Sequence, residues 1–321
     1  MSVRLGAPRS CFPRLSLAAC IAVLLVAGSS TPCDPTPGMA TAVATGGADP
    51  TWRHDRLWDD GKAEFAAYEA TWRRYEQLYT GRVLLVLVKE PWAPDLGVKA
   101  DRPRPDGFDV LKLNHVRDIP TGIYTYHQMA SIHFRRDDGN LVKLVASSTE
   151  ACGIATARLA SGVLDTHSYF DGEGDRRTTV PATALPEDAL PALLRDYVRG
   201  DPPESLQVLP LLLAGRFGTL QPEWFKVRKG KELSHTVPAG TFKAIDIVLQ
   251  KSEKTRTYTF EAAAPHRLLR FRTQDGTEYR LSKVERLAYW TLHTPGDESW
   301  WPPHLLDRTN RATTPPREAN P

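Results

Sequence analysis

The sequence predicts a mainly β protein, built as a curved antiparallel sheet or half-barrel with one or two helices. Several β-rich runs separated by turn dipeptides such as Asp138-Gly139 and Asp275-Gly276 support this prediction, and in several of them polar and apolar residues alternate. Only one segment has the start and stop signals of a helix. The clearest β-rich runs are residues 82–88, 141–147, 164–170 and 240–250.

Residues 1–30 are expected to be a signal peptide. Three arginines and no acidic residue precede an apolar core at residues 15–28, and two serines follow that core. The core is shorter than the roughly 20 residues of a membrane span, which favours a cleaved signal over a retained membrane anchor. The protein is therefore expected to be exported, to the periplasm or in association with the outer membrane.

The cysteines leave open whether the exported protein is lipid-anchored or free. Cys20 ends a Leu-Ala-Ala-Cys string that resembles a lipidation site, and Cys33 is a second candidate for a lipid anchor. Without lipidation the protein would be released free, so any membrane contact is expected only through an anchor or a retained signal. Cys152 is expected to be a free, buried thiol.

The charge of the chain is close to balanced once the signal is removed. The full sequence has 41 basic and 38 acidic residues, and the signal removes three arginines. A balanced chain without a basic run gives no electrostatic basis for binding nucleic acid.

Composition divides the rest of the chain into three parts. Residues 31–50 are rich in Pro, Gly, Thr and Ala and are expected to be a flexible spacer. Residues 51–301 are expected to form the β-rich domain, with two sub-halves that meet near residues 200–222. Residues 302–321 are expected to be a disordered tail.

Three segments of this domain have distinct patterns. Residues 186–200 begin with Pro-Glu-Asp and end at Gly200, which predicts a helix. Aromatic residues in 62–79 follow a spacing of three and four, so the pattern by itself favours a helix there. Residues 240–286 predict an antiparallel meander of four strands, with Asp275-Gly276 as a hairpin turn.

Candidates for chemistry gather in residues 147–175. Cys152 and His167, with Glu150 or Asp171, are candidates for a thiol nucleophile, its base and an orienting carboxylate. Alternate carboxylates in the string DGEGD are candidates for a calcium site, although the string does not match the EF-hand loop. Those metal candidates are Asp171, Glu173 and Asp175. No nucleotide-binding, hydrolase-elbow or zinc motif is present, and no cofactor is expected.

Aromatic side chains are the other notable class, because they can either fill a core or line an apolar cleft. The residues proposed as lining such a cleft are Trp72, Tyr75, Tyr124, Tyr126 and Trp290.

Five strings together suggest a family. They are WDDGKAEFAAYE (58–69), GRVLLVLVKEPW (81–92), VLKLNHVRDIPTGIYTY (110–126), LVKLVASSTEACG (141–153) and HSYFDGEGD (167–175). The chain resembles an uncharacterised family of exported bacterial proteins, many of them lipoproteins, that is often labelled septum formation inhibitor Maf. The nucleotide pyrophosphatases of that name have a Ser-x-Arg-Arg motif near the N-terminus, which is absent here.

The string VPAGTFKAIDIVLQ at 237–250 is similar to exported proteins of unknown function with a curved sheet akin to periplasmic lipoprotein carriers. This similarity implies that residues 62–75 form a first strand, and we adopt the strand over the helix. The Arg-Tyr-Gly of that strand in the family is Arg74-Tyr75-Glu76 here, so the turn that follows is expected to differ.

These observations lead to a hypothesis of function. The protein is expected to be a non-enzymatic envelope protein that binds an apolar ligand, a lipid or a partner protein of the envelope, by analogy of fold. The alternatives are an enzyme that uses Cys152 and His167, and a structural protein stabilised by calcium.

Overall fold

A computed structural model describes residues 47–306 of the chain, and these residues fall within one compact unit. The predicted signal peptide, Cys20, Cys33 and most of the predicted spacer lie outside the described residues. So does the predicted tail from residue 307 onward.

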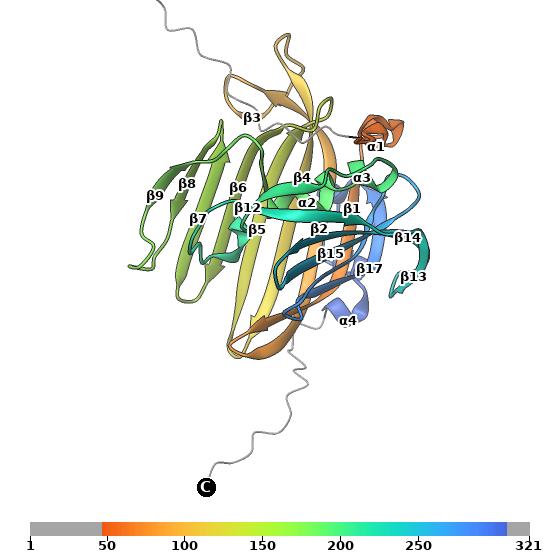
Figure 1. Cartoon of the computed structure of the whole chain (residues 1–321). Coiled ribbons are helices and arrows are strands. Elements are labelled where there is room, and N and C mark those ends of the chain that lie inside the picture. Colours follow the sequence, from red (N-terminus) through yellow and green to blue (C-terminus); the bar gives the residue numbers. More distant parts are fainter. Residues whose placement is uncertain (1–46, 307–321) are drawn as a thin grey trace, which may run out of the picture. The chain divides into compact units, whose positions relative to one another are not determined.

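The prediction of a mainly β, curved antiparallel sheet is confirmed. The described residues form one 17-stranded sheet that is antiparallel except for one parallel pair (Figure 1). The strands before the central helical segment are β1 (Ala63–Arg74), β2 (Gln77–Ala93), β3 (Val98–Lys99), β4 (Phe108–Thr121), β5 (Tyr124–Arg135), β6 (Leu141–Glu150), β7 (Gly153–Ala160), β8 (Val163–His167), β9 (Arg176–Thr179) and β10 (Ala184–Pro186). Those after it are β11 (Ser205–Leu209), β12 (Glu223–Lys229), β13 (Leu233–Val237), β14 (Gly240–Lys251), β15 (Lys254–Glu261), β16 (Leu268–Thr273) and β17 (Glu278–Leu287).

The helical elements are short. They are α1 (Thr51–His54), α2 (Leu190–Leu193), α3 (Asp196–Arg199) and α4 (Pro303–Leu306), with 3-10 turns η1 (Arg56–Asp59), η2 (Glu187–Ala189), η3 (Leu212–Ala214), η4 (Tyr289–Thr291) and η5 (Asp297–Trp300).

Strand β1 joins two half-sheets, because it pairs with β2 along one edge and with β17 along the other. From β2 the pairing continues through β4, β5, β6, β7 and β8 to β9, which we call the N-terminal half-sheet. From β17 it continues through β16, β15, β14, β12 and β11 to β10, which we call the C-terminal half-sheet. The outermost strands β9 and β10 do not pair with each other, so the sheet is open.

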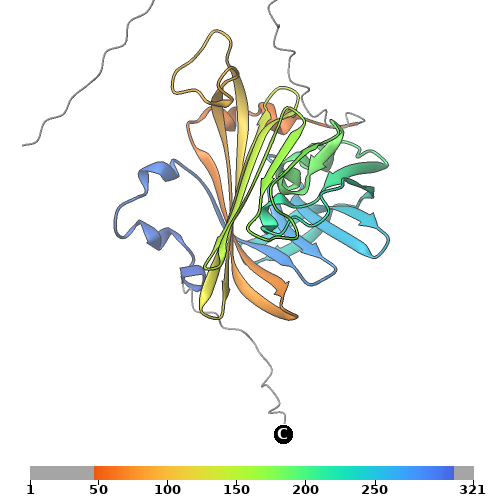
Figure 2. The same ribbon diagram turned by 90° about the vertical axis from the view of Figure 1, so that its left-hand side faces the viewer.

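The two half-sheets lie as layers with a helical segment between them, formed by η2, α2 and α3 together with η3 (Figures 1 and 2). Turns η2 and η3 contact β5, η3 also contacts β6, and α3 contacts β14. Side chains from both half-sheets and from this segment form one continuous hydrophobic core. Because apolar burial is the main favourable term in folding, this core keeps the curved, open sheet packed against the segment.

A helical segment lies in residues 186–200, where the helix is expected, but it is not one continuous helix. The structure has η2, α2 and α3 in succession, interrupted at Leu194 and Arg195. Nearly every residue of the segment is buried, so packing against two sheet layers determines its path more than helical propensity does.

Residues 62–79 form strands, as the resemblance implies, and the helix that the aromatic spacing favours is wrong. Strand β1 runs to Arg74, and a two-residue turn leads into β2. The spacing misleads because a bulge at Ala67/Tyr68 shifts the alternation, while Tyr75 lies in the turn and Tyr79 on the next strand.

The four-strand meander expected in residues 240–286 is confirmed as β14 to β17, each paired antiparallel with the next. Asp275 and Gly276 lie in the β16–β17 turn, where Gly276 has a φ of 93°. Only glycine adopts such a backbone without strain.

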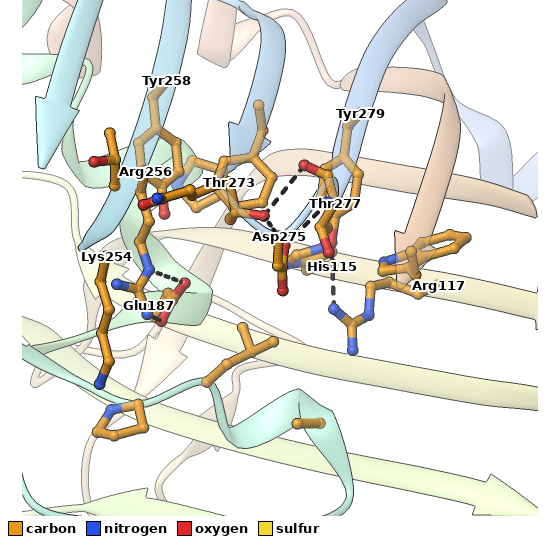
Figure 3. A pocket seen from close by; sticks show the side chains of 18 of the residues that line it. His115, Arg117, Glu187, Lys254, Arg256, Tyr258, Thr273, Asp275, Thr277 and Tyr279 are labelled. Carbon is orange, nitrogen blue, oxygen red and sulfur yellow. Dashed lines mark hydrogen bonds and ion pairs between the residues drawn. The ribbon is translucent and has the colours of Figure 1, made fainter. Parts of the chain in front are cut away.

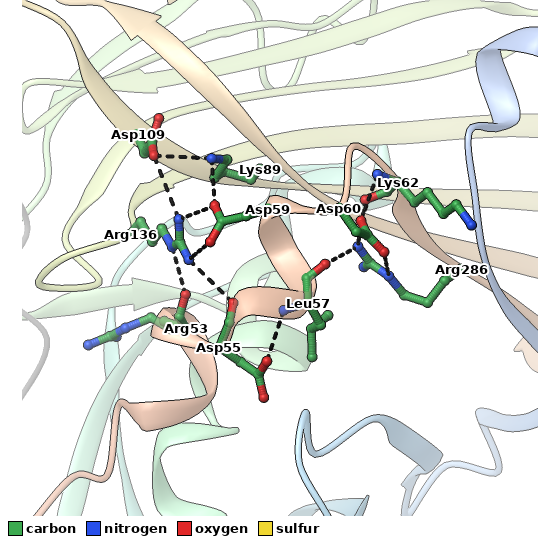
Figure 4. Close-up of polar contacts among 10 residues, drawn as sticks. All are labelled: Arg53, Asp55, Leu57, Asp59, Asp60, Lys62, Lys89, Asp109, Arg136 and Arg286. Carbon is green, nitrogen blue, oxygen red and sulfur yellow. Dashed lines mark hydrogen bonds and ion pairs between the residues drawn. The ribbon is translucent and has the colours of Figure 1, made fainter.

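Polar contacts fix the segment before β1 to the sheet (Figure 4). The Asp59 carboxylate accepts hydrogen bonds from Arg136 at 2.7 and 3.0 Å and from Lys89 at 2.7 Å. These hydrogen bonds hold the pKa of Asp59 well below its usual value. Arg286 binds the Asp60 carboxylate and the Leu57 carbonyl in the same way.

Residues 288–306 lie along the outer face of the sheet, on the left in Figure 2. Tyr289 stacks on Phe65 at 5.1 Å, and Arg82 donates to the Leu305 carbonyl at 3.3 Å. The expectation that disorder starts at residue 302 is therefore wrong for residues 302–306. These residues include α4, and Leu305 is buried.

The β1–β2 turn offers a test of backbone strain. Tyr75 and Glu76 have φ values of 48° and 61°, which cost a residue with a Cβ roughly 1 kcal/mol each. We expect Glu76→Gly to raise the free energy of unfolding by about 0.5–1 kcal/mol, measured by urea denaturation. Glu76→Ala keeps the Cβ and is the control. Equal effects of the two variants would contradict strain as the cause.

Candidate functional site

A cavity of about 670 Å³ opens between the two half-sheets, beside the helical segment (Figure 3). Strands β1, β4, β15, β16 and β17 contribute its walls, and η2, α2 and residues 210–217 cover it. This volume lies in the range of pockets that hold one small ligand. It is a candidate site lined wholly by described residues.

Most of the wall is apolar or aromatic. Phe271 and Tyr279 pack at 5.0 Å between ring centroids, Tyr258 and Phe271 at 4.8 Å, and Trp72 and Tyr279 at 5.9 Å. Leu211 and Phe217 face them from the covering segment. Linked aromatic rings of this kind give a rigid surface for an apolar chain.

Arg117 is the main charged group at one end of the cavity, and its side chain is buried. Its Nε donates to the Gln128 side-chain oxygen at 3.0 Å, its Nη2 donates to the same oxygen, and its Nη1 donates to the Tyr279 hydroxyl at 3.3 Å. Gln128 in turn donates to the Ser148 hydroxyl at 3.0 Å and to the Ala214 carbonyl at 3.2 Å. This network holds Arg117 in place through neutral partners only.

The covering segment approaches this network closely at Gly215. Its φ is 76°, and a Cβ there would lie 2.4 Å from the Ser148 hydroxyl oxygen. Glycine is therefore required at this position for the segment to lie over β5 and β6.

His115 lies two residues before Arg117 on the same face of β4, with its ring edge-on to Tyr279 at 5.8 Å. Neither ring nitrogen has a hydrogen-bond partner in the part of the chain that is described. Burial, together with the positive charge of Arg117, lowers the pKa of His115 to about 3, against a small opposing effect of the Asp188 backbone. The ring is therefore neutral at physiological pH.

Glu187 and Asp275, which also line the cavity, have partners of their own. Arg256 donates to both oxygens of Glu187, at 2.5 and 2.7 Å. The Asp275 carboxylate accepts hydrogen bonds from Thr273 and from the Thr277 backbone. Although burial opposes it, these bonds keep the pKa of Asp275 below its usual value.

Asp188 holds the segment that covers the cavity in place. Its fully buried carboxylate accepts the backbone N–H groups of Leu212 at 2.8 Å and Leu213 at 2.9 Å. These are donors at the start of η3, which a helix cannot satisfy internally. Asp188 therefore positions the turn that brings Ala214 over the cavity.

Of the five aromatic residues proposed for a ligand cleft, the structure places only Trp72 in the cavity wall. Tyr75, Tyr124 and Tyr126 form a separate cluster, with phenol oxygens 2.5 Å apart for Tyr75 and Tyr126 and 3.2 Å apart for Tyr75 and Tyr124. Trp290 is about half exposed and lies in the segment on the outer face. The cluster arises because the β1–β2 and β4–β5 turns end side by side.

The candidate thiol site is dispersed. Cys152 is exposed in the two-residue β6–β7 turn, so the expectation of a buried thiol is wrong. His167 pairs with Thr156 on β7 and so lies roughly 13 Å along the strand from Cys152. His167 contacts Asp175 at 3.2 Å, and Glu150 accepts from Tyr169. No hydrogen bond joins Cys152, His167 and Glu150 in the described residues.

The candidate calcium ligands likewise face different partners. Glu173 accepts the backbone N–H groups of Phe217 at 3.1 Å and Gly218 at 3.2 Å, and the Ser168 hydroxyl at 2.8 Å. Asp171 accepts the Gly172 N–H, and Asp175 pairs with His167. Within residues 47–306 no three His, Cys, Asp or Glu side chains gather as a metal site.

The sequence contains a signal for Arg117 and His115 that the sequence-based predictions above do not include. Residues 111–119 alternate, and Leu111, Leu113 and Ile119 face the core. His115 and Arg117 occupy the same phase, so they are polar residues on an apolar face. Polar groups in such positions are informative because burying them is costly unless they are paired.

The fold and the cavity define a mainly β protein with a largely apolar cavity that opens to solvent. No family model, curated protein or solved structure matches the chain. No helix in the described part is both long and apolar enough to cross a membrane.

Proposed function

We propose that this protein binds an apolar ligand in the cavity between its half-sheets, without catalysing a reaction, and does so outside the cytoplasm. The observation that supports the proposal is the cavity itself, with a volume of about 670 Å³ and walls of linked aromatic rings. Pockets for apolar ligands combine such walls with a few polar groups that fix orientation.

The well-defined structure of the segment that covers the cavity is consistent with this role. The covering segment is held by specific contacts of Asp188 and Gly215. A protein that needed only a stable core would gain by filling this space, because an empty apolar volume forfeits dispersion contacts. The signal-like N-terminus and the resemblance to exported proteins support a role in the cell envelope, where lipids are the abundant apolar molecules.

The test is binding of the neutral apolar dye phenylnaphthylamine, whose fluorescence rises in an apolar site. We expect saturable binding of about one dye per protein. Ala214→Phe places a ring in the cavity and is expected to weaken binding at least about tenfold, which corresponds to about 1.4 kcal/mol. Ala151→Phe adds the same ring at an exposed turn and is the matched control.

Extraction of protein purified from its own envelope gives a second readout, since a bound lipid would appear by mass spectrometry. The absence of both dye binding and a co-purified apolar molecule would rule out the proposal. Equal dye binding by the Ala214→Phe and Ala151→Phe variants would place the dye outside the cavity and contradict it as well.

A further inference from the structure

The polar groups at one end of the cavity are nearly all hydrogen-bond donors. Arg117 has N–H groups left on Nη1 and Nη2 after its bonds to Gln128 and Tyr279. The Trp72 Nε1–H is buried and has no partner among the described residues. The Tyr279 hydroxyl accepts from Arg117, which leaves its own proton to donate.

These donors converge on one place. Tyr279 contacts Arg117 at 3.3 Å, and its ring lies 5.9 Å from that of Trp72 and 5.8 Å from that of His115 (Figure 3). All four side chains line the cavity. An end of a cavity that presents mainly donors is complementary to a group that only accepts.

The charge at this end is also uncompensated. Arg117 is 6% exposed, and no carboxylate of the described residues lies within ion-pair distance of it. Among the carboxylates that line the cavity, Glu187 and Asp275 are bound to Arg256 and to Thr273 and Thr277 instead, and Glu253 is exposed. Burying a cation costs several kcal/mol unless an anion or strong acceptors compensate for it.

We propose that the cavity selects an amphiphile with one long apolar chain and a single carboxylate, which binds Arg117. This inference rests on the proposed function, and it names the ligand class of the same site. The apolar chain would lie along Phe271, Tyr258 and Phe217, and the carboxylate would accept from Arg117 and Tyr279.

A single negative charge fits better than a double one. Arg117 is the buried cation at this end, since Arg216, which also lines the cavity, is exposed, and His115 is buried and neutral and can supply only one ring N–H. The planar guanidinium also suits a carboxylate, which accepts two parallel N–H groups. The volume suits one chain rather than a two-chain phospholipid.

The test compares ligands that share one chain and differ in head group. Hexadecanoate, hexadecanol and hexadecyl phosphate are titrated into the full protein, with displacement of phenylnaphthylamine as the readout. We expect hexadecanoate to bind at least about tenfold more tightly than hexadecanol. Arg117→Met is expected to remove this preference while binding hexadecanol within about twofold of the original protein. Arg117→Lys, which keeps the charge, is expected to restore part of it.

Arg158→Met is the matched control, because it removes an exposed arginine of the same half-sheet that lies outside the cavity. If Arg117→Met does not fold, Tyr279→Phe replaces it and is expected to reduce the preference by a smaller factor. Equal affinity for hexadecanoate and hexadecanol, or an unchanged preference in the variants, would overturn the inference while dye binding still supports the function. Tightest binding of hexadecyl phosphate would overturn the carboxylate assignment. Failure of all ligands and of the dye would instead reject the proposed function.

Discussion

Arg195→Met is expected to lower the free energy of unfolding by about 3–5 kcal/mol. Arg195 lies in the helical segment between the half-sheets, where it is 1% exposed, and it pairs with Glu64 of β1, which is 3% exposed. Its Nη2 is 2.7 Å from one Glu64 oxygen, and its Nη1 donates to the other oxygen at 3.3 Å and to the Pro265 carbonyl at 3.1 Å.

The large effect comes from Glu64, which stays buried when Arg195 is replaced. Without Arg195, the Glu64 carboxylate stays buried with its charge uncompensated, or must take up a proton to remain there. Methionine retains most of the apolar length of the side chain, so loss of packing contributes little. The pair also connects the segment that lines the cavity to the strand that joins the two half-sheets.

Chemical denaturation of the variants measures this effect. Arg195→Met combined with Glu64→Leu removes both charges and is expected to recover much of the loss, since a buried pair can often be replaced by apolar residues. Arg177→Met removes an exposed arginine and is the control, with an expected change below about 0.5 kcal/mol. A loss below about 1 kcal/mol for Arg195→Met would show that water reaches Glu64.

Asp188 is expected to make the stability fall by up to roughly 3 kcal/mol as the pH rises from about 4 to above 6. Burial raises the pKa of Asp188 from 3.8 to about 6, which outweighs the hydrogen bonds from Leu212 and Leu213. In this window the folded protein keeps a proton on Asp188 that the unfolded chain has lost. The contribution is therefore fully present below about pH 4 and is lost as the pH rises through about 6.

The measurement is the difference in unfolding free energy between the original protein and Asp188→Asn across this pH range. Taking the difference removes the opposite trend of carboxylates with lowered pKa values, such as Asp59 and Glu173. Asp171→Asn changes an exposed carboxylate and is the control. A pH-independent difference between the original protein and Asp188→Asn would mean that Asp188 is ionised in the folded state throughout.

The candidate site was only partly predictable. Trp72 was named from the sequence and lines the cavity, whereas Tyr75 and Tyr126 look equivalent in the sequence and lie at the ends of hairpins. The difference arises from position along the sheet, because Tyr126 belongs to the same core as Trp72 but lies at the start of β5, beside Tyr75 of the β1–β2 turn. Residues that are far apart in the sequence, such as Arg117 and Tyr279, come into contact only because distant strands pack against each other.

Local sequence patterns are enough to predict the β class, the meander of residues 240–286 and the place of the central helical segment. Alternation, turn dipeptides and helix start and stop signals are local, so they survive without tertiary context. Three other features come from contacts between distant parts of the chain. Strand β1 joins two half-sheets, and the helical segment is buried between them. Arg117 faces the cavity without a carboxylate partner. These features depend on contacts between residues far apart in the chain, where burial and charge pairing outweigh local preference.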